Sequence, residues 1–432
     1  MSINETNIFG FMYEQYHLPN KPKLFEAFSG IGCQRMAFDR LGIDYEMVGI
    51  SEIDKYALQS YMAIHGDTKN YGSICDIKGK DLSQIDLFTY SFPCTDLSKA
   101  GKQKGLNDTR SGLVYEVLRI LQQLNDLDRL PKVLIMENVV DLVQTKFIRQ
   151  FQAIQLELEK LGYSNYTETL NAKDFGVAQN RNRVFMVSIL GEYSYEFPKP
   201  FTLEKRLKDY LEDDVDEKYY IKDYDSASFI NDNYSQLNGG KWEKLHDIGR
   251  RVYSTNFVSP TIHTMGGGNL EPKIVLIDDN FITIPEATEK GYAEARDGDD
   301  VYINRPHQKR GVVQNQMIQT LKTSGDDIGV VVNGNNYSDK SIEKIRANIT
   351  DVETLSKTIT ANPQRATIDS ATLVRDNLRI RKLIPLECWR LMGIDDECFH
   401  KAEKVCSNSQ LYKQAGNGIV VDVFAAIVKN LI

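Results

Sequence analysis

The sequence predicts an α/β protein with a mostly parallel central sheet and helices on both of its faces. Between residues 23 and 190, short apolar runs alternate with segments whose apolar residues have helical spacing. The turn between the first strand and the first helix holds Gly30 and Gly32, which permit close backbone approach to a ligand. After Pro198-Lys199-Pro200 the helical spacing is lost and short β-prone runs replace it. These observations predict a helix-covered sheet followed by a smaller, β-rich region.

The elements of the helix-covered sheet follow one another in a regular order. We expect strands at residues 23–28, 46–51, 85–90, 132–136 and 183–190. We expect helices at residues 33–41, 54–64, 111–124 and 147–161. Helical spacing returns at residues 385–392 and 420–431, and the last helix needs a sheet face to bury its apolar stripe. We therefore assign residues 1–190 and 376–432 to one α/β domain, which is interrupted by an inserted domain at residues 191–375.

The inserted region is rich in Asn, Asp, Gly and Thr. Three Thr-rich runs in it are each followed by a second β-prone run, at residues 258–264 with 274–277, 317–323 with 330–332, and 355–360 with 372–374. This pattern predicts three related strand–turn–strand units, and chance recurrence of Thr-rich strands is the alternative.

The composition of the 432 residues is ordinary for a soluble globular protein, with 41% hydrophobic and 26% charged residues. No apolar stretch approaches the ~18 residues of a membrane helix, and residues 1–23 carry no secretion signal. The six cysteines lie singly, without a CxxC pair, so the sequence predicts neither a zinc site nor a disulfide framework. We expect reduced thiols, a cytoplasmic protein, and no metal ion or membrane contact.

The net charge of −8, taken alone, argues against a nucleic-acid partner. The charge of a nucleic-acid-binding surface is local, however, and therefore has to be sought in clusters. Basic residues cluster at residues 99–104, 181–183, 250–251, 307–310 and 375–382. Each cluster by itself also fits a solvated loop, so the charge pattern leaves both readings open.

A thiol and a carboxyl are expected at the same edge of the sheet. Cys94 follows the apolar run 85–90 and the loop segment Ser91-Phe92-Pro93, and Glu137 follows the apolar run 132–136. Open α/β sheets bind ligands at the carboxyl ends of their strands. A thiol nucleophile beside a carboxylic acid can add to a pyrimidine ring and protonate it. Each residue also fits a structural role, Cys94 as a buried cysteine and Glu137 as a helix-capping acid.

Other residues at this edge fit a cofactor site and a supporting cation. Glu52 lies at the end of the second strand, about twenty residues after the glycine turn, where an acidic residue can hold two ribose hydroxyls. The chain has no full GxGxxG motif and no phosphate-binding P-loop. Arg181 and Arg183 precede the last strand, and Arg183 can orient a carboxylate or hydrogen-bond a base carbonyl. A surface ion pair is the alternative for Arg183.

Together these segments resemble the DNA (cytosine-5-)-methyltransferase family, of bacterial or phage type. The resemblance covers about residues 23–190 and 376–432. It rests on Leu24 to Gly32, Ser91-Phe92-Pro93-Cys94, Glu137-Asn138-Val139, Gln179-Asn180-Arg181-Asn182-Arg183, Arg381 to Gly393, and Gln414-Ala415-Gly416-Asn417. It implies an α/β fold: a doubly wound, Rossmann-like methyltransferase domain with a smaller, β-rich target-recognition domain inserted before the C-terminal motifs. Residues 191–375 would be that recognition domain, where family motifs are not expected.

The resemblance also implies roles for individual residues. Cys94 would be the nucleophile, Glu137 the acid at ring nitrogen N3, and Arg183 the contact to the base O2, with Arg181 supporting the site. The implied S-adenosyl-L-methionine site comprises Phe28, Gly30, Gly32, Glu52, Ile53, Asp76, Ile77, Pro93 and Asn417. Two residues depart from the family pattern, Gly418 in place of a usual Ser and Thr95 in place of a frequent Gln. Neither departure touches the nucleophile, so we expect activity.

The implied reaction is transfer of a methyl group from S-adenosyl-L-methionine to carbon 5 of cytosine in a specific duplex DNA sequence, by base flipping and covalent catalysis. An RNA cytosine-5 methyltransferase and a non-catalytic DNA-binding relative are the alternatives. The large inserted region favours duplex DNA, and the intact Cys94, Glu137 and Arg183 argue against a non-catalytic relative. We expect a monomer. The resemblance also allows for a cognate restriction endonuclease in the same system, without a stable complex.

The sequence-reading surface is expected within residues 191–375. The Gly-rich turn Gly266-Gly267-Gly268-Asn269 would let backbone approach DNA closely. Lys309 and Arg310 would contact phosphate or guanine. The three Thr-rich strand pairs would form the scaffold that presents these residues.

Overall fold

The computed structural model describes residues 13–93, 112–221, 226–231, 234–238, 241–255, 257–265, 270–277 and 378–432, together with five short strands between residues 282 and 330. The chain divides into two compact units, residues 1–274 with 382–432 and residues 275–381. Each unit is considered by itself below. Cys94, Thr95, the Gly266–Asn269 turn, Lys309 and Arg310 lie outside the described residues.

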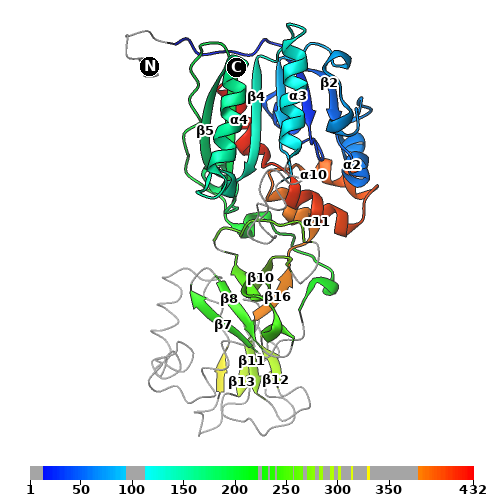
Figure 1. The fold of residues 1–432 in the computed structure, drawn as a ribbon. Coiled ribbons are helices and arrows are strands. Elements are labelled where there is room, and N and C mark those ends of the chain that lie inside the picture. The colour runs from blue at the N-terminus through cyan, green and yellow to red at the C-terminus, as the bar shows by residue number, and fades with distance from the viewer. Residues whose placement is uncertain are drawn as a thin grey trace. The chain divides into compact units, whose positions relative to one another are not determined.

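A six-stranded sheet forms the centre of the first unit (Figure 1). Its strands are β1 (Lys23–Ala27), β2 (Glu46–Ser51), β3 (Leu87–Tyr90), β4 (Val133–Val139), β5 (Tyr163–Asn171) and β6 (Asn182–Leu190), in the order β2-β1-β3-β4-β6-β5. Strands β1 to β4 pair in parallel, whereas β6 runs antiparallel to both β4 and β5. The mostly parallel sheet expected from the sequence is confirmed. Edge strand β5 was not expected, because its half-exposed residues lack the apolar run of a buried strand.

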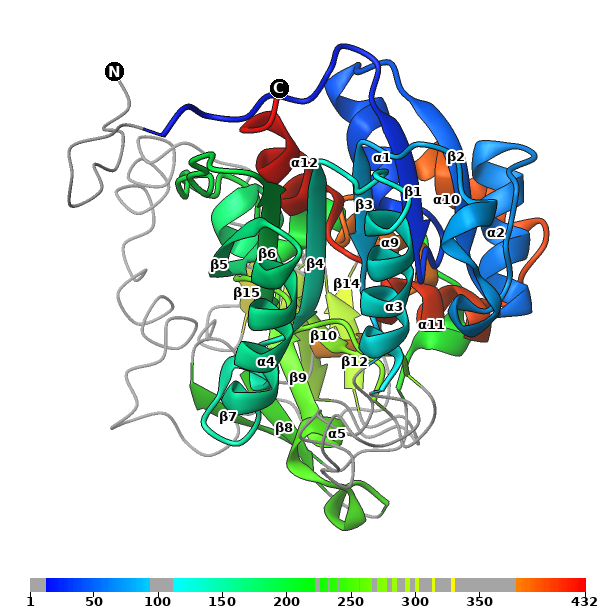
Figure 2. The same cartoon turned by 45° about the horizontal axis from the view of Figure 1, so that its top comes forward.

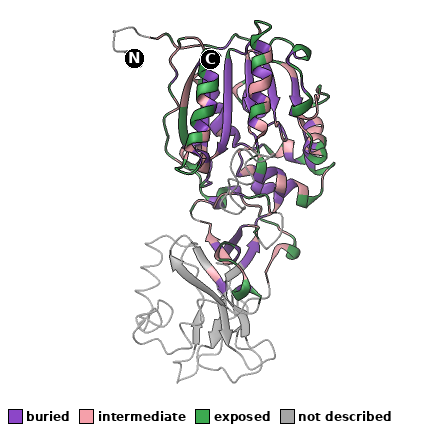
Figure 3. Cartoon of the chain, viewed as in Figure 1, coloured by how far each residue is buried: buried purple, intermediate pink, exposed green. Residues whose placement is uncertain are grey.

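Helices cover both faces of this sheet (Figures 1 and 2). On one face lie α3 (Leu113–Asn125) and α4 (Ile148–Lys160), and on the other lie α1 (Cys33–Leu41) and α12 (Val421–Lys429). The apolar stripes of α3 and α4 share one core cluster with side chains of β1, β3, β4 and β6. The central strands are buried along their length, as Figure 3 shows. The C-terminal helix therefore packs beside α1 in the first unit, as its apolar stripe requires.

Shorter helices complete the first unit. Helix α2 (Lys55–His65) begins at Asp54, whose side chain accepts hydrogen bonds from the amides of Tyr56 and Ala57. Helix α9 (Pro385–Arg390) was expected from the sequence, whereas α10 (Asp396–Glu403) and α11 (Asn408–Asn417) were not. Both are short, and only two residues of α10 are buried. The helical spacing in that part of the sequence is correspondingly weak.

The strands of the inserted region are short. In the first unit, β7 (Ser226–Asn231), β8 (Tyr234–Asn238) and β9 (Arg251–Ser254) pair antiparallel, and α5 (Asp247–Arg250) precedes β9. Strands β10 (Lys273–Ile277) and β16 (Leu378–Lys382) pass from one unit into the other. In the second unit, β11 (Ile282–Pro285) pairs with β12 (Tyr292–Ala295), and β13 (Asp300–Tyr302) pairs with β14 (Val313–Gln314) and β15 (Ile328–Val330), all antiparallel.

The first of the three strand–turn–strand units is wrong in its first half. The described residues 257–265 form no regular strand; Ser259 instead makes a single parallel bridge to Gln179. The Ser259 amide donates to Ala178 O (2.8 Å), and the Asn180 amide donates to Ser259 O (2.8 Å). The backbone of this segment thus pairs with the segment Gln179-Asn180-Arg181-Asn182-Arg183, called the QxRxR loop below, and not with a sheet. The second half of the unit forms within β10, and the other two units fall largely outside the described residues.

The Glu26 side chain, just before the glycine turn, is held in unusual surroundings. Glu26 on β1 is 1% exposed and accepts hydrogen bonds from the Arg35 amide (2.9 Å) and the Tyr61 hydroxyl (2.9 Å). Burial raises the pKa of Glu26 to about 7, although both hydrogen bonds oppose the shift.

Cys33, the first residue of α1, explains the departure at Gly418. A Cβ atom on Gly418 would lie 3.1 Å from Cys33 Sγ, and the Ile419 amide hydrogen-bonds to the same thiol. Burial raises the pKa of Cys33 to about 12, so its sulfur is a packed thiol and not a nucleophile. A side chain at residue 418 would therefore need this sulfur to move by a few tenths of an ångström.

The buried Glu26 carboxyl predicts a pH-dependent stability. Its pKa is 4.5 when exposed and about 7 in the fold. Its contribution is therefore complete below pH 4.5 and lost as the pH rises through 7, by on the order of 2–4 kcal/mol. In urea unfolding, Glu26→Gln should gain stability relative to the wild-type chain between pH 5 and pH 8. A difference between the two proteins that stays constant with pH would contradict the assignment.

The Cys33–Gly418 contact predicts a compensating pair of substitutions. Gly418→Ser should destabilise the chain by about 1–3 kcal/mol through overpacking. Cys33→Ala frees the space, so the double variant Cys33→Ala/Gly418→Ser should melt above Gly418→Ser alone. Cys75→Ala, which removes an exposed thiol, is the matched control and should rescue nothing. Strictly additive melting shifts in the double variant would rule out the packing account.

Candidate active site

Glu137 and Arg183 form an ion pair at the carboxyl edge of the sheet. Strand β4 extends through Glu137 to Val139, which lies opposite Arg183 on β6, so Glu137 and Arg183 are diagonal neighbours on paired strands. Arg183 Nε lies 3.1 Å from Glu137 Oε1, and the two side chains are only 18% and 10% exposed. Burial lowers the pKa of Arg183, and the Glu137 carboxylate opposes that shift. The pair thus combines a carboxyl and a guanidinium in a largely dry environment.

The segment that leads to Cys94 is tied to the same strand. Ser91, Phe92 and Pro93 continue directly from β3, whose last residue pairs with Met136 of β4. Asn138 Nδ2 donates to Phe92 O (3.2 Å), and Asn138 Oδ1 accepts from the Val139 amide (2.8 Å). Since Asn138 follows Glu137, this contact fixes the chain just before residue 94 beside the ion pair. Cys94 itself lies outside the described residues.

The glycine turn and Glu52 form one connected loop structure. Phe28, Gly30 and Gly32 all have positive φ, of 57°, 57° and 80°. Glu52 Oε2 accepts from the Gly30 amide (2.8 Å), and Glu52 Oε1 accepts from the amides of Ile53 (2.8 Å) and Asp54 (2.7 Å). Burial raises the pKa of Glu52, while these three amides oppose the shift. Glu52 therefore links the ends of β1 and β2 in addition to any ligand contact.

The residues around this turn fit a nucleoside cofactor. A Cβ atom on Gly30 would meet nothing within 4 Å, so the turn faces open space. Ile53 beside it is 78% exposed, an unusual state for a large apolar side chain that a ring can cover. Ser29 Oγ and Ser91 Oγ are buried without a hydrogen-bond partner among the described residues, so both can serve a ligand.

The remaining expected cofactor residues lie on several elements. Asp76 ends a 3₁₀ turn, Ile74–Asp76, and is exposed, whereas Ile77 is 3% exposed. Pro93 and Asn417 are exposed, and Asn417 is the last residue of α11. Gln414, three residues earlier, accepts from the Ser60 hydroxyl (3.0 Å) and donates to Tyr56 O (3.0 Å). The segment Gln414-Ala415-Gly416-Asn417, called the closing motif below, is thereby held against α2.

Arg181 makes a set of contacts that the sequence does not reveal. Its side chain is 3% exposed and donates to three backbone carbonyls, those of Ile262 (2.9 Å), Gly416 (3.0 Å) and Gly418 (2.8 Å). Burial lowers the pKa of Arg181 to about 9. Arg181 therefore joins the inserted region to the closing motif.

Gln179 is a second junction residue, one that the sequence analysis quoted only as part of a motif. Fully buried, it accepts from the Ile262 amide (3.0 Å) and donates to Leu391 O (2.5 Å). Close packing accompanies these bonds, since a Cβ atom on Gly416 would lie 2.3 Å from the backbone of His263 and Thr264. In the sequence Gln179 stands between Ala178 and Asn180 in a segment without strand-like or helical spacing, so it cannot be told from an exposed loop residue.

Two negative findings apply to the described part of the chain. No group of three His, Cys, Asp or Glu side chains there could hold a metal ion. None of the helices described has the length and apolar character that crossing a membrane requires.

This arrangement can bind a planar base by its polar edge. A carboxyl can donate to or protonate a ring nitrogen, and the neighbouring guanidinium can hold a carbonyl oxygen. The loop around Gly30 and Glu52 can hold a nucleoside at the same edge of the sheet. Such a site suits chemistry in which a cofactor delivers a group to a base.

Comparison with known proteins identifies the family. A family model described as C-5 cytosine-specific DNA methylase matches residues 23–432. The orphan methyltransferase M.SPRI of Bacillus phage SPR is 30% identical, over 95% of this chain and 98% of its own length. The orphan methyltransferase M.SPBetaI of Bacillus phage SPbeta is 29% identical, over 96% of this chain and 98% of its own length.

Solved structures agree on the fold. The Entamoeba histolytica methyltransferase EhMeth has a TM-score of 0.59 at 17% identity, and covers 96% of this chain and 98% of its own. The S. pombe Dnmt2 methyltransferase has a TM-score of 0.55 at 16% identity, over 95% and 98%. The chain therefore belongs to the C-5 cytosine-specific DNA methylase family, and it transfers a methyl group from S-adenosyl-L-methionine to carbon 5 of cytosine in DNA.

Proposed function

We propose that Cys94, Glu137 and Arg183 act together on one cytosine extruded from duplex DNA. The observation that carries the proposal is the Glu137–Arg183 pair at 3.1 Å, beside the segment that Asn138 holds immediately before Cys94. A base inside a duplex is out of reach of such a recessed site, so the target has to leave the stack.

The proposed reaction proceeds by addition to the cytosine ring, methyl transfer and elimination. The Cys94 thiolate attacks carbon 6 and forms a carbon–sulfur bond, while Glu137 hydrogen-bonds or protonates N3 and Arg183 holds O2. S-adenosyl-L-methionine, when bound, supplies the electrophilic methyl group that carbon 5 accepts. A base then removes the proton from carbon 5. The electron pair of that carbon–hydrogen bond re-forms the double bond between carbons 5 and 6, the bond between carbon 6 and Cys94 sulfur breaks to free the thiolate, and N3 returns any proton it received to Glu137. The demethylated cofactor leaves as the neutral thioether, S-adenosylhomocysteine.

Cofactor binding is proposed for the glycine turn and its neighbours. Phe28, Gly30 and Gly32 would line the turn, Glu52 would hold the ribose hydroxyls, and Ile53 would cover the adenine. Asp76, Ile77, Pro93 and Asn417 would complete the site. The open space at Gly30 and the 78% exposure of Ile53 support this assignment. Asn417 would contribute from the closing motif that Arg181 and Gln414 hold in place.

Target recognition is proposed for the inserted, β-rich domain, residues 191–375. Its support is the loss of family motifs in this region and the antiparallel strands found within it. We also propose that the chain acts as a cytoplasmic monomer, and that any cognate restriction endonuclease meets it only through the shared DNA sequence. The five described cysteines are all unpaired, which supports a reducing compartment.

The sequence left an RNA cytosine-5 methyltransferase open as an alternative, and the match of residues 23–432 to the C-5 cytosine-specific DNA methylase family favours DNA. Transfer from labelled cofactor to duplex DNA, with transfer RNA as the second substrate, separates the two candidates.

The nucleophile is tested by Cys94→Ser, with Cys75→Ser as the exposed-cysteine control. Cys94→Ser should lose methyl transfer by on the order of a thousandfold or more, because an alcohol without a strong base is a poor nucleophile. Its cofactor affinity, measured by calorimetry, should stay near that of the wild-type chain.

The same assignment predicts a covalent trap. DNA that contains 5-fluorocytosine should form an adduct with the wild-type chain in the presence of cofactor, because fluorine cannot leave as a proton does. Mass spectrometry should map the adduct to residue 94. An adduct on another cysteine, or near-normal transfer by Cys94→Ser, would overturn the assignment.

A further inference from the structure

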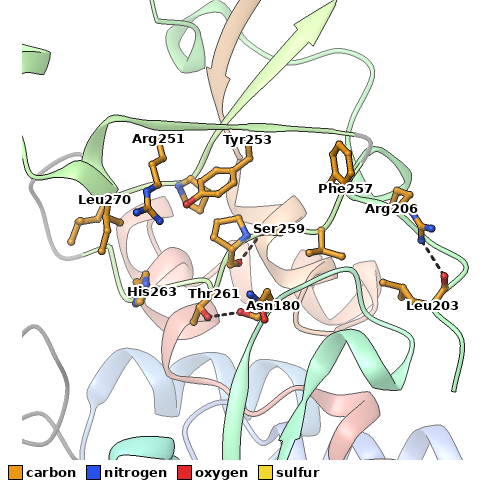
Figure 4. A pocket seen from close by; sticks show the side chains of 14 residues that line it. Asn180, Leu203, Arg206, Arg251, Tyr253, Phe257, Ser259, Thr261, His263 and Leu270 are labelled. Atoms are coloured by element: carbon orange, nitrogen blue, oxygen red, sulfur yellow. Dashed lines mark hydrogen bonds between the residues drawn. The ribbon is translucent and has the colours of Figure 1, made fainter. Parts of the chain in front are cut away.

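A pocket of about 590 Å³ opens beside the QxRxR loop (Figure 4). Its walls come from Asn180, from the residues before the 3₁₀ turn Leu207–Tyr210, and from α5, β9 and the segment that follows β9. Figure 4 shows Arg251 at one end and Arg206 at the other. The Leu207 amide donates to Phe257 O (2.8 Å), so the walls next to Arg206 are tied together. We call this the Arg206 pocket.

The lining of the Arg206 pocket is unusual for this chain. The sequence holds 60 acidic and 52 basic residues, yet the described side chains that line the pocket include two arginines and a histidine and no carboxylate. Three large apolar side chains on its walls are also exposed, Ile248 (44%), Phe257 (39%) and Leu270 (39%). Cations interleaved with exposed apolar and aromatic surface suit a nucleic-acid strand, which offers phosphates, sugars and base faces.

The two arginines are not equivalent. Arg251 forms an ion pair with Asp247, so part of its charge is already balanced. The Arg206 side chain is exposed and donates to the backbone oxygens of Leu203 (3.0 Å) and Lys205 (3.1 Å), while the Arg206 backbone amide donates to Asp209 Oδ2 (2.6 Å). No carboxylate pairs with the Arg206 side chain among the described residues. Arg206 is thus the cation of the pocket that can take a phosphate without first breaking an ion pair.

One wall of the pocket is close along the chain to the Glu137–Arg183 pair. Asn180 lines it, and Arg183 of the same segment reaches Glu137. Three residues of chain span at most about 11 Å. Since bases along one strand are spaced by about 3.4 Å, this reach corresponds to roughly three nucleotides.

We propose that the Arg206 pocket holds the DNA strand a few nucleotides from the target cytosine, with a phosphate on Arg206 and a sugar or base face on Phe257. This inference rests on the proposed function, since it takes the Glu137–Arg183 pair as the position of the target. It adds a contact surface to the recognition elements expected from the sequence, which lie at residues 266–269 and 309–310.

The test measures binding of each variant to a short fluorescein-labelled DNA duplex over a range of salt concentrations. Arg206→Ala should weaken binding several-fold and reduce the slope of log affinity against log salt by about 1, the loss of one phosphate contact. Arg206→Lys should keep the slope. Phe257→Ala should weaken binding on the order of tenfold at every salt concentration and leave the slope unchanged.

Lys132→Ala is the control, because Lys132 is exposed at the opposite, amino edge of the sheet and loses the same single charge. Cofactor affinity and melting temperature should stay unchanged in all four variants. If Arg206→Ala and Phe257→Ala match Lys132→Ala while the wild-type chain methylates DNA, the pocket is not a DNA surface and the proposed function stands. If Cys94→Ser methylates DNA normally, the assignment of the target to the Glu137–Arg183 pair is wrong, and the proposed function fails whatever the pocket binds.

Discussion

The buried Arg181 guanidinium is the interaction on which the site depends. Its donors satisfy backbone carbonyls at residues 262, 416 and 418, which are separated from it by 81, 235 and 237 positions along the chain. A buried carbonyl left unpaired costs about 1–3 kcal/mol, so these segments are held where Arg181 reaches them. Through this contact a segment of the inserted region and the closing motif meet the strand that carries Arg183.

The sheet, its direction and the segments around it could be predicted from the sequence, because buried strands and amphipathic helices leave periodic patterns. The fourth strand was expected to end at Met136, whereas β4 continues to Val139. The polar residues Glu137 and Asn138 hide that continuation, which depends on pairing with β6. Short helices α10 and α11 and edge strand β5 were missed for a related reason: each takes its stability from neighbours distant in the sequence. The contacts of Arg181 and Gln179 are of the same kind.

Side chains near Gly418 and Gly30 contribute to packing and loop structure in ways that the sequence does not show. Gly418 lacks the side chain that the family usually has, and Cys33 Sγ lies where it would crowd one, 3.1 Å from an added Cβ. Glu52, expected to face the ribose, also fastens the Gly30 turn to the end of β2. A single side chain can thus serve both the ligand and the loop that binds it, which composition and spacing alone do not reveal.

Amide hydrogen exchange of an Arg181→Met variant tests this account most directly. Met keeps the apolar bulk but leaves three carbonyls without a donor. Three amides that are hydrogen-bonded in the fold report on the two segments. The Ser259 and Ile262 amides report on the segment of the inserted region, and the Gly418 amide reports on the closing motif. In this variant the amides of both segments should lose their protection from exchange together, while the amides of β1 to β4 stay protected. Wild-type exchange in either segment would contradict it.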